Sequence, residues 1–258
     1  MALDIAKLEE EIKEEQQQTE DKPPKTMEEL YNLLQQLGSA WREDNAYIVN
    51  EGQKNERTVT PLPNVSTVAQ VLEKHCYFTF IGDGEISDVS KLYIYHLDLG
   101  YYVSSDDIFR KLVLKYDNRL TSHRFFNELV AYIRTDTKIQ PPLSDYKYIP
   151  VSNGVYNIKT KQLEEFRPDF IITSKIKTSY NPLAKKPILG GWFDFDKWLN
   201  TLACNDNELV TLLWQVMNEA INPNRTRKKM VLLVGDGNNG KGTFQALLEN
   251  LIGRENIS

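Results

Sequence analysis

Near its end the chain reads Val231-Leu-Leu-Val234, then Gly235-Asp-Gly-Asn-Asn-Gly-Lys-Gly-Thr243, then Phe244-Gln-Ala-Leu-Leu-Glu-Asn-Leu-Ile252. Four consecutive apolar residues predict a short strand that is buried on both faces, as in a parallel sheet. The apolar residues after the turn recur at helical spacing, so they predict a helix. Strand, glycine-rich turn and helix, in this order, are the context of a phosphate-binding loop.

The residue types of this loop suit a polyphosphate ligand. Glycines have no side chain to keep the backbone away from a phosphate, and they can take a positive φ. The N-terminus of the following helix offers unpaired N–H donors, and Lys241 would reach the β- and γ-phosphates. The predicted nucleotide-binding residues are Gly235, Asp236, Gly237, Asn238, Asn239, Gly240, Lys241, Gly242 and Thr243. The alternative is a glycine-rich surface turn that carries a lysine by chance.

One position departs from the common phosphate-loop pattern. Gly242 stands where a serine or threonine usually binds Mg²⁺, and the hydroxyl follows one residue later, at Thr243. Some nucleotide kinases carry the same Gly-Lys-Gly-Thr sequence. Thr243 is therefore the predicted Mg²⁺ contact, through the bound nucleotide.

Composition bounds the function. The chain has 258 residues, 41% of them hydrophobic, which is enough for one large or two modest domains with a core. Its apolar runs are far shorter than a membrane span, and its acidic beginning is not a secretion signal. Cys76 and Cys204 lack CxxC spacing, which argues against a zinc ribbon or a disulfide framework and favours a reducing cytoplasm.

The net charge of −5 is unevenly distributed. Residues 1–21 hold eight acidic residues against two lysines, so the rest of the chain is close to neutral. An acidic total therefore does not exclude a nucleic-acid partner, but it restricts such a surface to a local patch.

The pattern predicts an α/β protein in four parts. Residues 1–25 read as an acidic tail and linker, 26–190 as an α+β domain, 191–229 as a helical lead-in, and 230–258 as the start of a P-loop α/β domain. In the α+β domain, a capping box at Thr26–Glu29 predicts a helix that Gly38 ends. The other elements expected there are a polar loop at 50–63, strands at 76–81 and 91–97, helices at about 105–117 and 121–134, and a turn at Asn153-Gly154 between two strands.

Two basic groups are candidates for nucleic-acid contact. The helices at about 105–117 and 121–134 fit a helix-turn-helix with Arg119 and Arg124 at the start of the second helix, but a plain packed helical hairpin is the commoner arrangement for such a pair. Before the loop stand Arg225, Arg227, Lys228 and Lys229. These four would contact a phosphate backbone or simply flank a buried strand as solvated charges.

Four elements together resemble a known family. They are Ile149-Pro-Val-Ser-Asn-Gly-Val-Tyr-Asn-Ile158, Tyr180-Asn-Pro182, the helical region from Trp192 to Ile221, and Gly235–Thr243. In order and spacing they resemble the C-terminal half of the primase-helicases of phages, satellite phages and plasmids, a part that poxvirus replication NTPases share. The resemblance covers about residues 75–258.

The resemblance implies a superfamily III helicase, an AAA+-type ATPase that assembles as a ring, usually a hexamer, and unwinds DNA at replication forks. It implies ATP and Mg²⁺ as cofactors, and DNA and other replication proteins as partners. Carried over by position, Gly235, Gly240, Lys241 and Thr243 would bind the nucleotide, and Asn238 and Asn239 fit the polar loop of this superfamily. Residues 26–190 would be the helicase-associated N-terminal domain.

No primase half is visible, and only 15 residues follow Thr243. The acidic strand, the polar sensor and the arginine finger of such an ATPase would all come later, so we expect the 258-residue chain alone to be inactive. Two alternatives remain: a P-loop nucleotide kinase remnant, and a non-enzymatic DNA-binding replication or regulatory protein with a vestigial P-loop.

Overall fold

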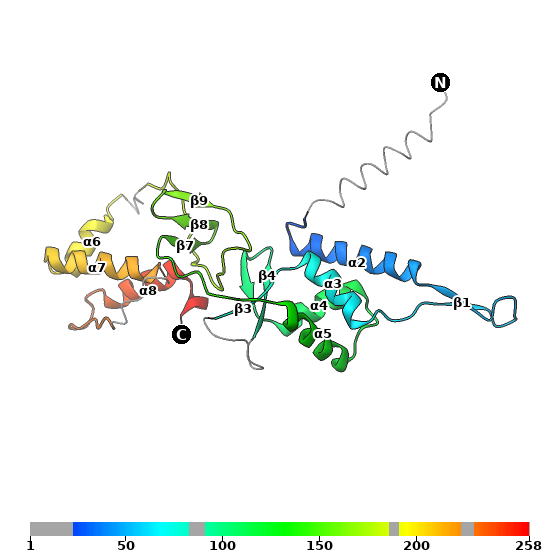
Figure 1. Cartoon of the computed structure of the whole chain (residues 1–258). Coiled ribbons are helices and arrows are strands. Elements are labelled where there is room, and N and C mark those ends of the chain that lie inside the picture. Colours follow the sequence, from blue (N-terminus) through cyan, green and yellow to red (C-terminus); the bar gives the residue numbers. More distant parts are fainter. Residues whose placement is uncertain (1–22, 83–90, 186–190, 223–229, 258) are drawn as a thin grey trace, which may run out of the picture. The chain divides into compact units, whose positions relative to one another are not determined.

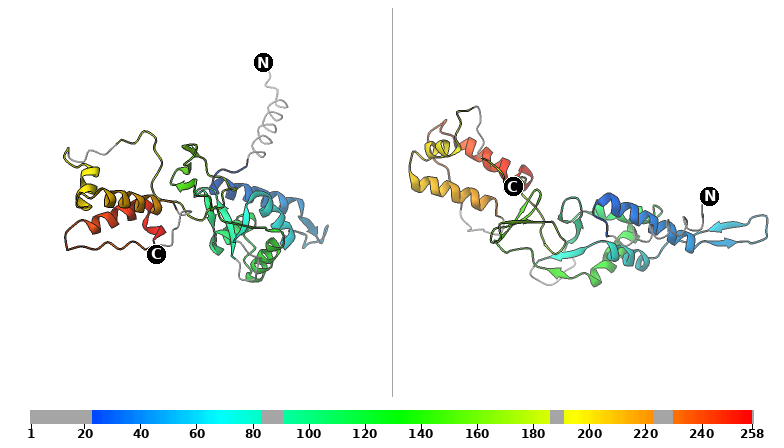
Figure 2. Two further views of the ribbon diagram at one scale, coloured as in Figure 1. Left: turned by 60° about the vertical axis from the view of Figure 1, so that its left-hand side comes forward. Right: turned by 90° about the horizontal axis from the view of Figure 1, so that it is seen from above.

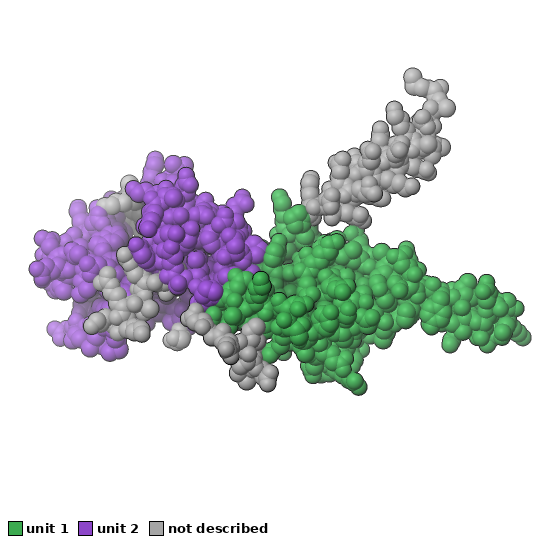
Figure 3. Space-filling model, in the orientation of Figure 1, with its two compact units in different colours: residues 1–99, 103–140 green, residues 100–102, 141–258 purple. Residues whose placement is uncertain are grey.

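The computed structural model describes residues 23–82, 91–185, 191–222 and 230–257. The chain divides into two compact units (Figure 3): Met1–Leu99 with Val103–Gln140, and Gly100–Tyr102 with Pro141–Ser258. Both units contain helices and antiparallel or mixed sheets, so the predicted fold class is confirmed. The predicted domain boundaries at 190 and 229 stay predictions.

Four helices form the body of the first unit: α2 (Met27–Asp44), α3 (Val65–His75), α4 (Asp106–Tyr116) and α5 (His123–Asp136). α2 packs against α4, and α3 packs against α5 (Figure 1). The predicted helices near 105–117 and 121–134 are confirmed by α4 and α5. The predicted cap is also confirmed, because the Glu29 N–H donates to Thr26 Oγ1 at 3.1 Å.

Gly38 does not end α2, which was the prediction; the helix continues to Asp44. A Cβ at Gly38 would overlap the carbonyl oxygen of Tyr116, at the end of α4. The glycine therefore serves close packing of two helices and not termination. The polar loop predicted for 50–63 also needs correction, because β1 (Tyr47–Val49) and β2 (Arg57–Val59) pair as an antiparallel hairpin that extends beyond α2 (Figure 1).

A four-stranded sheet covers one side of these helices. Its strands are β3 (Phe78–Ile81), β4 (Leu92–His96), β5 (Tyr101–Val103) and β6 (Ile139–Gln140), in the order β5-β4-β3-β6. β3 and β4 are antiparallel, with Thr79 opposite Tyr93, whereas β6 runs parallel to β3. The two predicted strands at 76–81 and 91–97 are confirmed. The core holds fully buried leucines from each helix, together with Cys76, whose thiol pKa burial raises to about 12.

Among the described residues of this unit, Asp117 is the buried carboxylate. Asp117 follows α4 and is 1% exposed, and its Oδ2 lies 2.7 Å from Arg119 Nη2 and 3.9 Å from Arg42 Nη1. Burial by itself would raise the pKa of the Asp117 carboxyl, but the hydrogen bonds from Arg119 and the charges of both arginines hold that pKa below its usual value. Arg119 also donates to the carbonyl oxygens of Thr60 (3.0 Å) and Pro61 (3.1 Å). The cluster thus ties the turn after α4 to the segment before α3.

The second unit combines a three-stranded antiparallel sheet with three helices. The strands β7 (Tyr148–Val151), β8 (Gly154–Asn157) and β9 (Gln162–Glu164) lie in that order, and the predicted turn at Asn153-Gly154 joins the first two. The helices are α6 (Phe195–Leu202), α7 (Asn207–Ala220) and α8 (Lys241–Ile252), followed by a short 3-10 turn, η1 (Arg254–Asn256). Figure 2 shows α7 and α8 side by side, as their contacts require.

Buried apolar residues hold α8 in place. Phe244 is 1% exposed and packs with Leu199 of α6 and with Leu213 and Met217 of α7. The other end of α8 is bound by hydrogen bonds, because Thr178 Oγ1 donates to the Leu251 carbonyl at 2.8 Å and the Lys177 N–H to the Ile252 carbonyl at 3.1 Å. None of the described helices is both long and apolar enough to cross a membrane.

Candidate nucleotide-binding loop

The glycine-rich segment forms a compact turn directly before α8. Asn238 (φ 58°) and Gly240 (φ 86°) are left-handed, and Gly240 is the N-cap residue of the helix. Asparagine and glycine are the residues that tolerate this backbone region best. The sequence therefore folds locally into a turn that leads straight into a helix N-terminus, and the predicted helix after the loop is confirmed.

The predicted strand before the loop is wrong. Residues 230–234 form no strand, and their side chains are exposed: Leu232 by 74% and Val234 by 82%. A run of apolar residues specifies a buried strand only where neighbouring strands complete its hydrogen bonds and cover its faces. Among the described residues no strand lies beside this run, so it stays extended and unpaired.

Lys241 turns its ammonium back over the loop. Its Nζ donates to the carbonyl oxygens of Gly235 (2.7 Å) and Asp236 (2.8 Å) and to Oδ1 of Asn239 (2.8 Å). An ammonium has three donors, so these three acceptors satisfy it fully. The contacts place the positive charge of Lys241 at the centre of the turn, within the ring that the loop backbone forms around it.

The N-terminus of α8 is open to a ligand. Its N-cap is a glycine without a side-chain oxygen, no side chain among the described residues caps it, and its first turn carries no acidic residue. The first three amides of a helix lack partners inside the helix, and the helix dipole is positive at this end. Here they belong to Lys241, Gly242 and Thr243, so the loop and the helix together offer an anion several N–H donors beside one ammonium.

The four loop glycines differ in how much space a side chain would have at each position. A Cβ on Gly235 would overlap the Asn239 side-chain amide, and one on Gly240 would lie 3.1 Å from Leu202 Cδ1. Gly237 and Gly242 have no atom within 4 Å of such a Cβ. Space and backbone therefore constrain positions 235 and 240, whereas position 242 has room for a side chain.

We expect Gly242→Ser to keep nucleotide affinity and Gly240→Ala to lose about tenfold, because a left-handed non-glycine residue costs roughly 1–2 kcal/mol. Serine at 242 meets open space and restores the commoner loop pattern, whereas alanine at 240 is strained and presses on Leu202. Titration of each variant with a fluorescent ATP analogue measures the difference. Equal losses in both variants would contradict this assignment of the loop positions.

An apolar groove of about 210 Å³ adjoins the loop. Its walls come from α7 and from the exposed run before the loop, and Asn239 and Lys241 lie at its polar end. The residues that line it are Leu202, Ala203, Leu209, Leu212, Leu213, Val216, Val231, Leu232, Leu233, Val234, Asn239 and Lys241. The groove is therefore continuous with the charged loop, and its apolar walls could contact an apolar part of a ligand that binds there.

A metal would depend on the nucleotide here. Thr243 lies exposed in the first turn of α8, where its hydroxyl can reach a metal that a phosphate carries. Within the described ranges, no three His, Cys, Asp or Glu side chains come together as a metal site. Thr243 would then contribute its hydroxyl to Mg²⁺ beside phosphate oxygens and water.

The predicted nucleic-acid residues do not form one surface. Arg225, Arg227, Lys228 and Lys229 lie outside the described residues. Arg119 is bound to Asp117 and to two backbone carbonyls, and Arg124 of α5 pairs with Glu128 at 2.8 Å. The role of these arginines in binding DNA stays a prediction. A second cavity, between α4 and α5, was not predicted, because its cationic residues are far apart in the sequence.

Comparison with protein families places most of the chain in a known family. The family model described as D5 N terminal like, which represents the N-terminal domain of D5-like primase-helicases, matches residues 20–204. The match covers the first unit, the three-stranded sheet and α6, and it ends before the loop at Gly235–Thr243. No curated protein matches the chain.

Proposed function

Because this chain belongs to the D5 N terminal like family, we propose that it is part of an ATP-dependent DNA helicase of phage or plasmid replication. The family assigns the chain to proteins of the primase-helicase kind, which are enzymes at full length. Nucleotide binding through Gly235–Thr243, ATP hydrolysis and unwinding are the proposed additions. The domain assignment is also proposed: residues 26–190 form the helicase-associated domain, residues 191–229 the helical lead-in, and residues 230–258 the start of the P-loop domain.

The observation that carries the proposal is the position of the Lys241 ammonium. It lies within 2.8 Å of three acceptors of the loop, directly before an uncapped helix N-terminus. Lysine in the centre of a glycine-rich turn, with helix amides behind it, is the arrangement that binds the β- and γ-phosphates of a nucleotide. A surface turn with a chance lysine would not require its glycines, whereas a Cβ at Gly235 would displace the Asn239 amide and one at Gly240 would press on Leu202 in a left-handed backbone.

Each loop residue then has a defined task. Bound Mg²⁺-ATP supplies the reactive phosphoanhydride and the metal charge. Lys241 balances the phosphate charge, and the amides of the loop and of α8 fix the phosphate oxygens. Thr243 contributes its hydroxyl to the metal, and Asn239, which now holds Lys241, becomes available to orient the ligand.

Ring assembly belongs to the same proposal. The glycine-rich loop resembles that of superfamily III helicases, which work as hexamers around DNA, and we infer the same state for this protein. Its partners would be single-stranded or forked DNA and other replication proteins. The replication context follows from the family, whereas the hexamer and the individual partners are inferences.

One observation favours a second candidate, a DNA-binding replication protein with a vestigial loop. The run before the loop forms no strand and exposes Leu232 by 74%, so the sheet that normally supports a phosphate loop is not assembled within the described residues. In that case the chain would bind DNA and would not bind nucleotide. The kinase remnant has no separate observation in its favour.

Parallel titrations separate these functions. A fluorescent ATP analogue and a labelled single-stranded oligonucleotide are each added to the 258-residue chain, with AMP as the nucleotide control. We expect both ligands to bind, and ATP to compete better than AMP, because AMP lacks the phosphates that Lys241 contacts. Binding of the oligonucleotide alone would favour the DNA-binding protein with a vestigial loop. Binding of nucleotide alone would favour a kinase, and binding of neither would overturn the proposal.

A further inference from the structure

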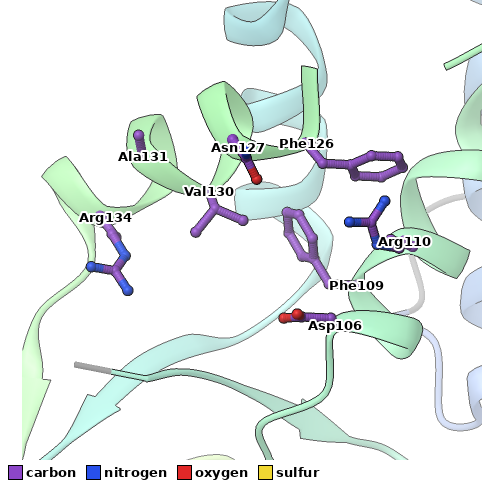
Figure 4. Close-up of a pocket in the computed structure, with 8 residues that line it drawn as sticks. All are labelled: Asp106, Phe109, Arg110, Phe126, Asn127, Val130, Ala131 and Arg134. Carbon is purple, nitrogen blue, oxygen red and sulfur yellow. The ribbon is translucent and has the colours of Figure 1, made fainter. Parts of the chain in front are cut away.

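A cavity of about 380 Å³ lies between α4 and α5 in the first unit. Figure 4 shows Arg110 and Arg134 at its opposite ends, with Phe109 and Val130 between them. A second cavity of about 200 Å³ shares Asp106, Phe109, Val130 and Arg134 with it and continues to Lys91 beside β4. The two cavities form one groove, which we call the α4–α5 groove.

The charge of the α4–α5 groove is positive. Its described lining residues include three cations, Arg110, Arg134 and Lys91, against one carboxylate, Asp106. The chain as a whole has a net charge of −5, so this concentration of positive charge differs from the average surface. A groove that focuses positive charge attracts polyanions and raises their local concentration.

Aromatic rings hold both arginines in position. The Arg110 guanidinium carbon lies 4.4 Å from the Phe126 ring centroid, and that of Arg134 lies 5.5 Å from the Phe80 ring centroid. Arg110 Nη2 also lies 3.3 Å from His123 Nδ1. A stacked guanidinium loses less conformational freedom when it binds an oxygen, because its plane is already fixed. Planar donors of this kind match phosphate oxygens.

We propose that the α4–α5 groove binds the backbone of single-stranded DNA, with Arg110 and Arg134 on two different phosphates of one strand and the apolar floor of Phe109 and Val130 beneath the sugars and bases. This inference deepens the proposed function, on whose DNA partner it rests. Such binding is largely independent of sequence, because the floor offers few groups that form directed hydrogen bonds.

The length of the groove favours a strand over a single nucleotide. Arg134 lies eight residues after Phe126, the ring on which Arg110 rests, which corresponds to about 12 Å along α5 at 1.5 Å per residue. As they lie in Figure 4, the two guanidinium groups do not converge on one point that a single phosphate could occupy. An acidic peptide would find the same cations, but its side chains would gain little from an apolar floor.

The test measures binding of fluorescein-labelled oligo(dT) to the nucleotide-free 258-residue chain by fluorescence anisotropy at several salt concentrations. Arg110→Ala should weaken binding about tenfold, since it removes a charge-assisted hydrogen bond to a phosphate. The slope of log affinity against log salt should fall in magnitude by about 0.7, the value for one phosphate of a single strand. Asn127→Glu, which adds a negative charge to the groove lining, should weaken binding as well.

Lys111→Ala is the matched control. Lys111 follows Arg110 on α4 and carries the same charge, but its ammonium lies over the Tyr31 ring at 4.5 Å and does not line the groove. Its removal should leave the salt slope within experimental error. Thermal melts check that each variant is folded, and where Arg110→Ala fails this check, Asn127→Glu decides.

Each further outcome is decisive. If oligo(dT) binds and both groove variants bind it like the wild type, the groove inference is overturned and the DNA partner stands. If the wild type binds no oligo(dT), both the groove inference and the proposed DNA partner are overturned. Nucleotide binding at Lys241 is tested separately, by the titration with the fluorescent ATP analogue. Equal competition by dTMP would indicate a mononucleotide pocket, and equal competition by a poly-glutamate peptide would indicate an acidic protein partner; either result would overturn the assignment to a DNA strand.

Discussion

We expect Lys241→Ala to lower the turnover of the proposed ATP hydrolysis and unwinding by about 10²–10³, the range for removing one preorganised group that stabilises transition-state charge. The ammonium of Lys241 is the group of the loop that carries a full positive charge beside the helix amides. Without it, the phosphate charge would be balanced by neutral N–H donors and Mg²⁺ alone. Steady-state ATPase and strand-displacement assays measure the effect.

The same substitution leaves the fold intact. To the extent that the structure describes the chain, Lys241 bonds within its own loop, and α8 is anchored by Phe244 and by the hydrogen bonds at its C-terminal end. The melting temperature of the variant should therefore match that of the wild type. Lys197→Ala serves as the control, because it removes the same charge from an exposed position on α6 of the same unit. Wild-type turnover in Lys241→Ala would remove the loop from the mechanism.

Asp117→Asn has the largest expected effect on stability, a loss of about 2 kcal/mol at neutral pH. Breaking a buried ion pair costs roughly 3–5 kcal/mol, and the value is lower here because the Arg119 side chain is 35% exposed and water can solvate part of it. The variant would weaken the links from Arg119 to the chain before α3 and from Arg42 to the end of α4. Urea unfolding of both proteins, followed by circular dichroism, gives the difference.

The effect depends on pH with a defined sign. The pKa of Asp117 is lowered in the folded protein, so its carboxylate stabilises the fold above the unfolded pKa of about 3.9. That contribution is lost as the pH falls through the lowered folded pKa. The gap between wild type and variant should therefore be full at pH 7 and close in the acid range. Glu128→Gln, which neutralises an exposed ion pair on α5, should show no such gap at any pH.

Local patterns predicted most of the elements. α4, α5, β3 and β4 follow from periodic apolar residues, and the β7–β8 turn follows from Asn153-Gly154. Each of these signals lies within a few residues of the element that it specifies. The N-cap of α2 was predictable for the same reason, because Thr26 and Glu29 belong to one helical turn.

The errors have a common physical cause, which is dependence on distant chain segments. Gly38 has the pattern of a helix stop, but its role is set by the Tyr116 carbonyl, 78 positions along the chain. The apolar run at 231–234 reads as a strand, yet a strand exists only with a partner. The missed hairpin at 47–59 is a local exception: it shows no buried apolar face, since Tyr47 and Ile48 are more than half exposed.

The two candidate sites also differ in whether local sequence could predict them. The glycine spacing and the following helix predicted the turn at Gly235–Thr243 and its lysine, because the whole loop is contiguous. The α4–α5 groove was missed, because Arg110 and Arg134 belong to different helices and acquire a common function only when those helices pack. The sequence shows only Arg110 next to Phe109 on one helix and Phe126 on the next helix. Such a pattern is too common to predict a binding site.

The internal hydrogen bonds of Lys241 make nucleotide binding an exchange reaction. An incoming ligand must first displace the carbonyls of Gly235 and Asp236 and the amide of Asn239, all within 2.8 Å of the ammonium. The oxygens of a single phosphate approach the ammonium from one side, whereas a triphosphate chain can place oxygens of two phosphates around it, so we expect the triphosphate to replace the three acceptors better. Under the proposed function we therefore expect affinity to rise with the number of phosphates, because each further phosphate helps to replace the three acceptors that Lys241 binds within the loop.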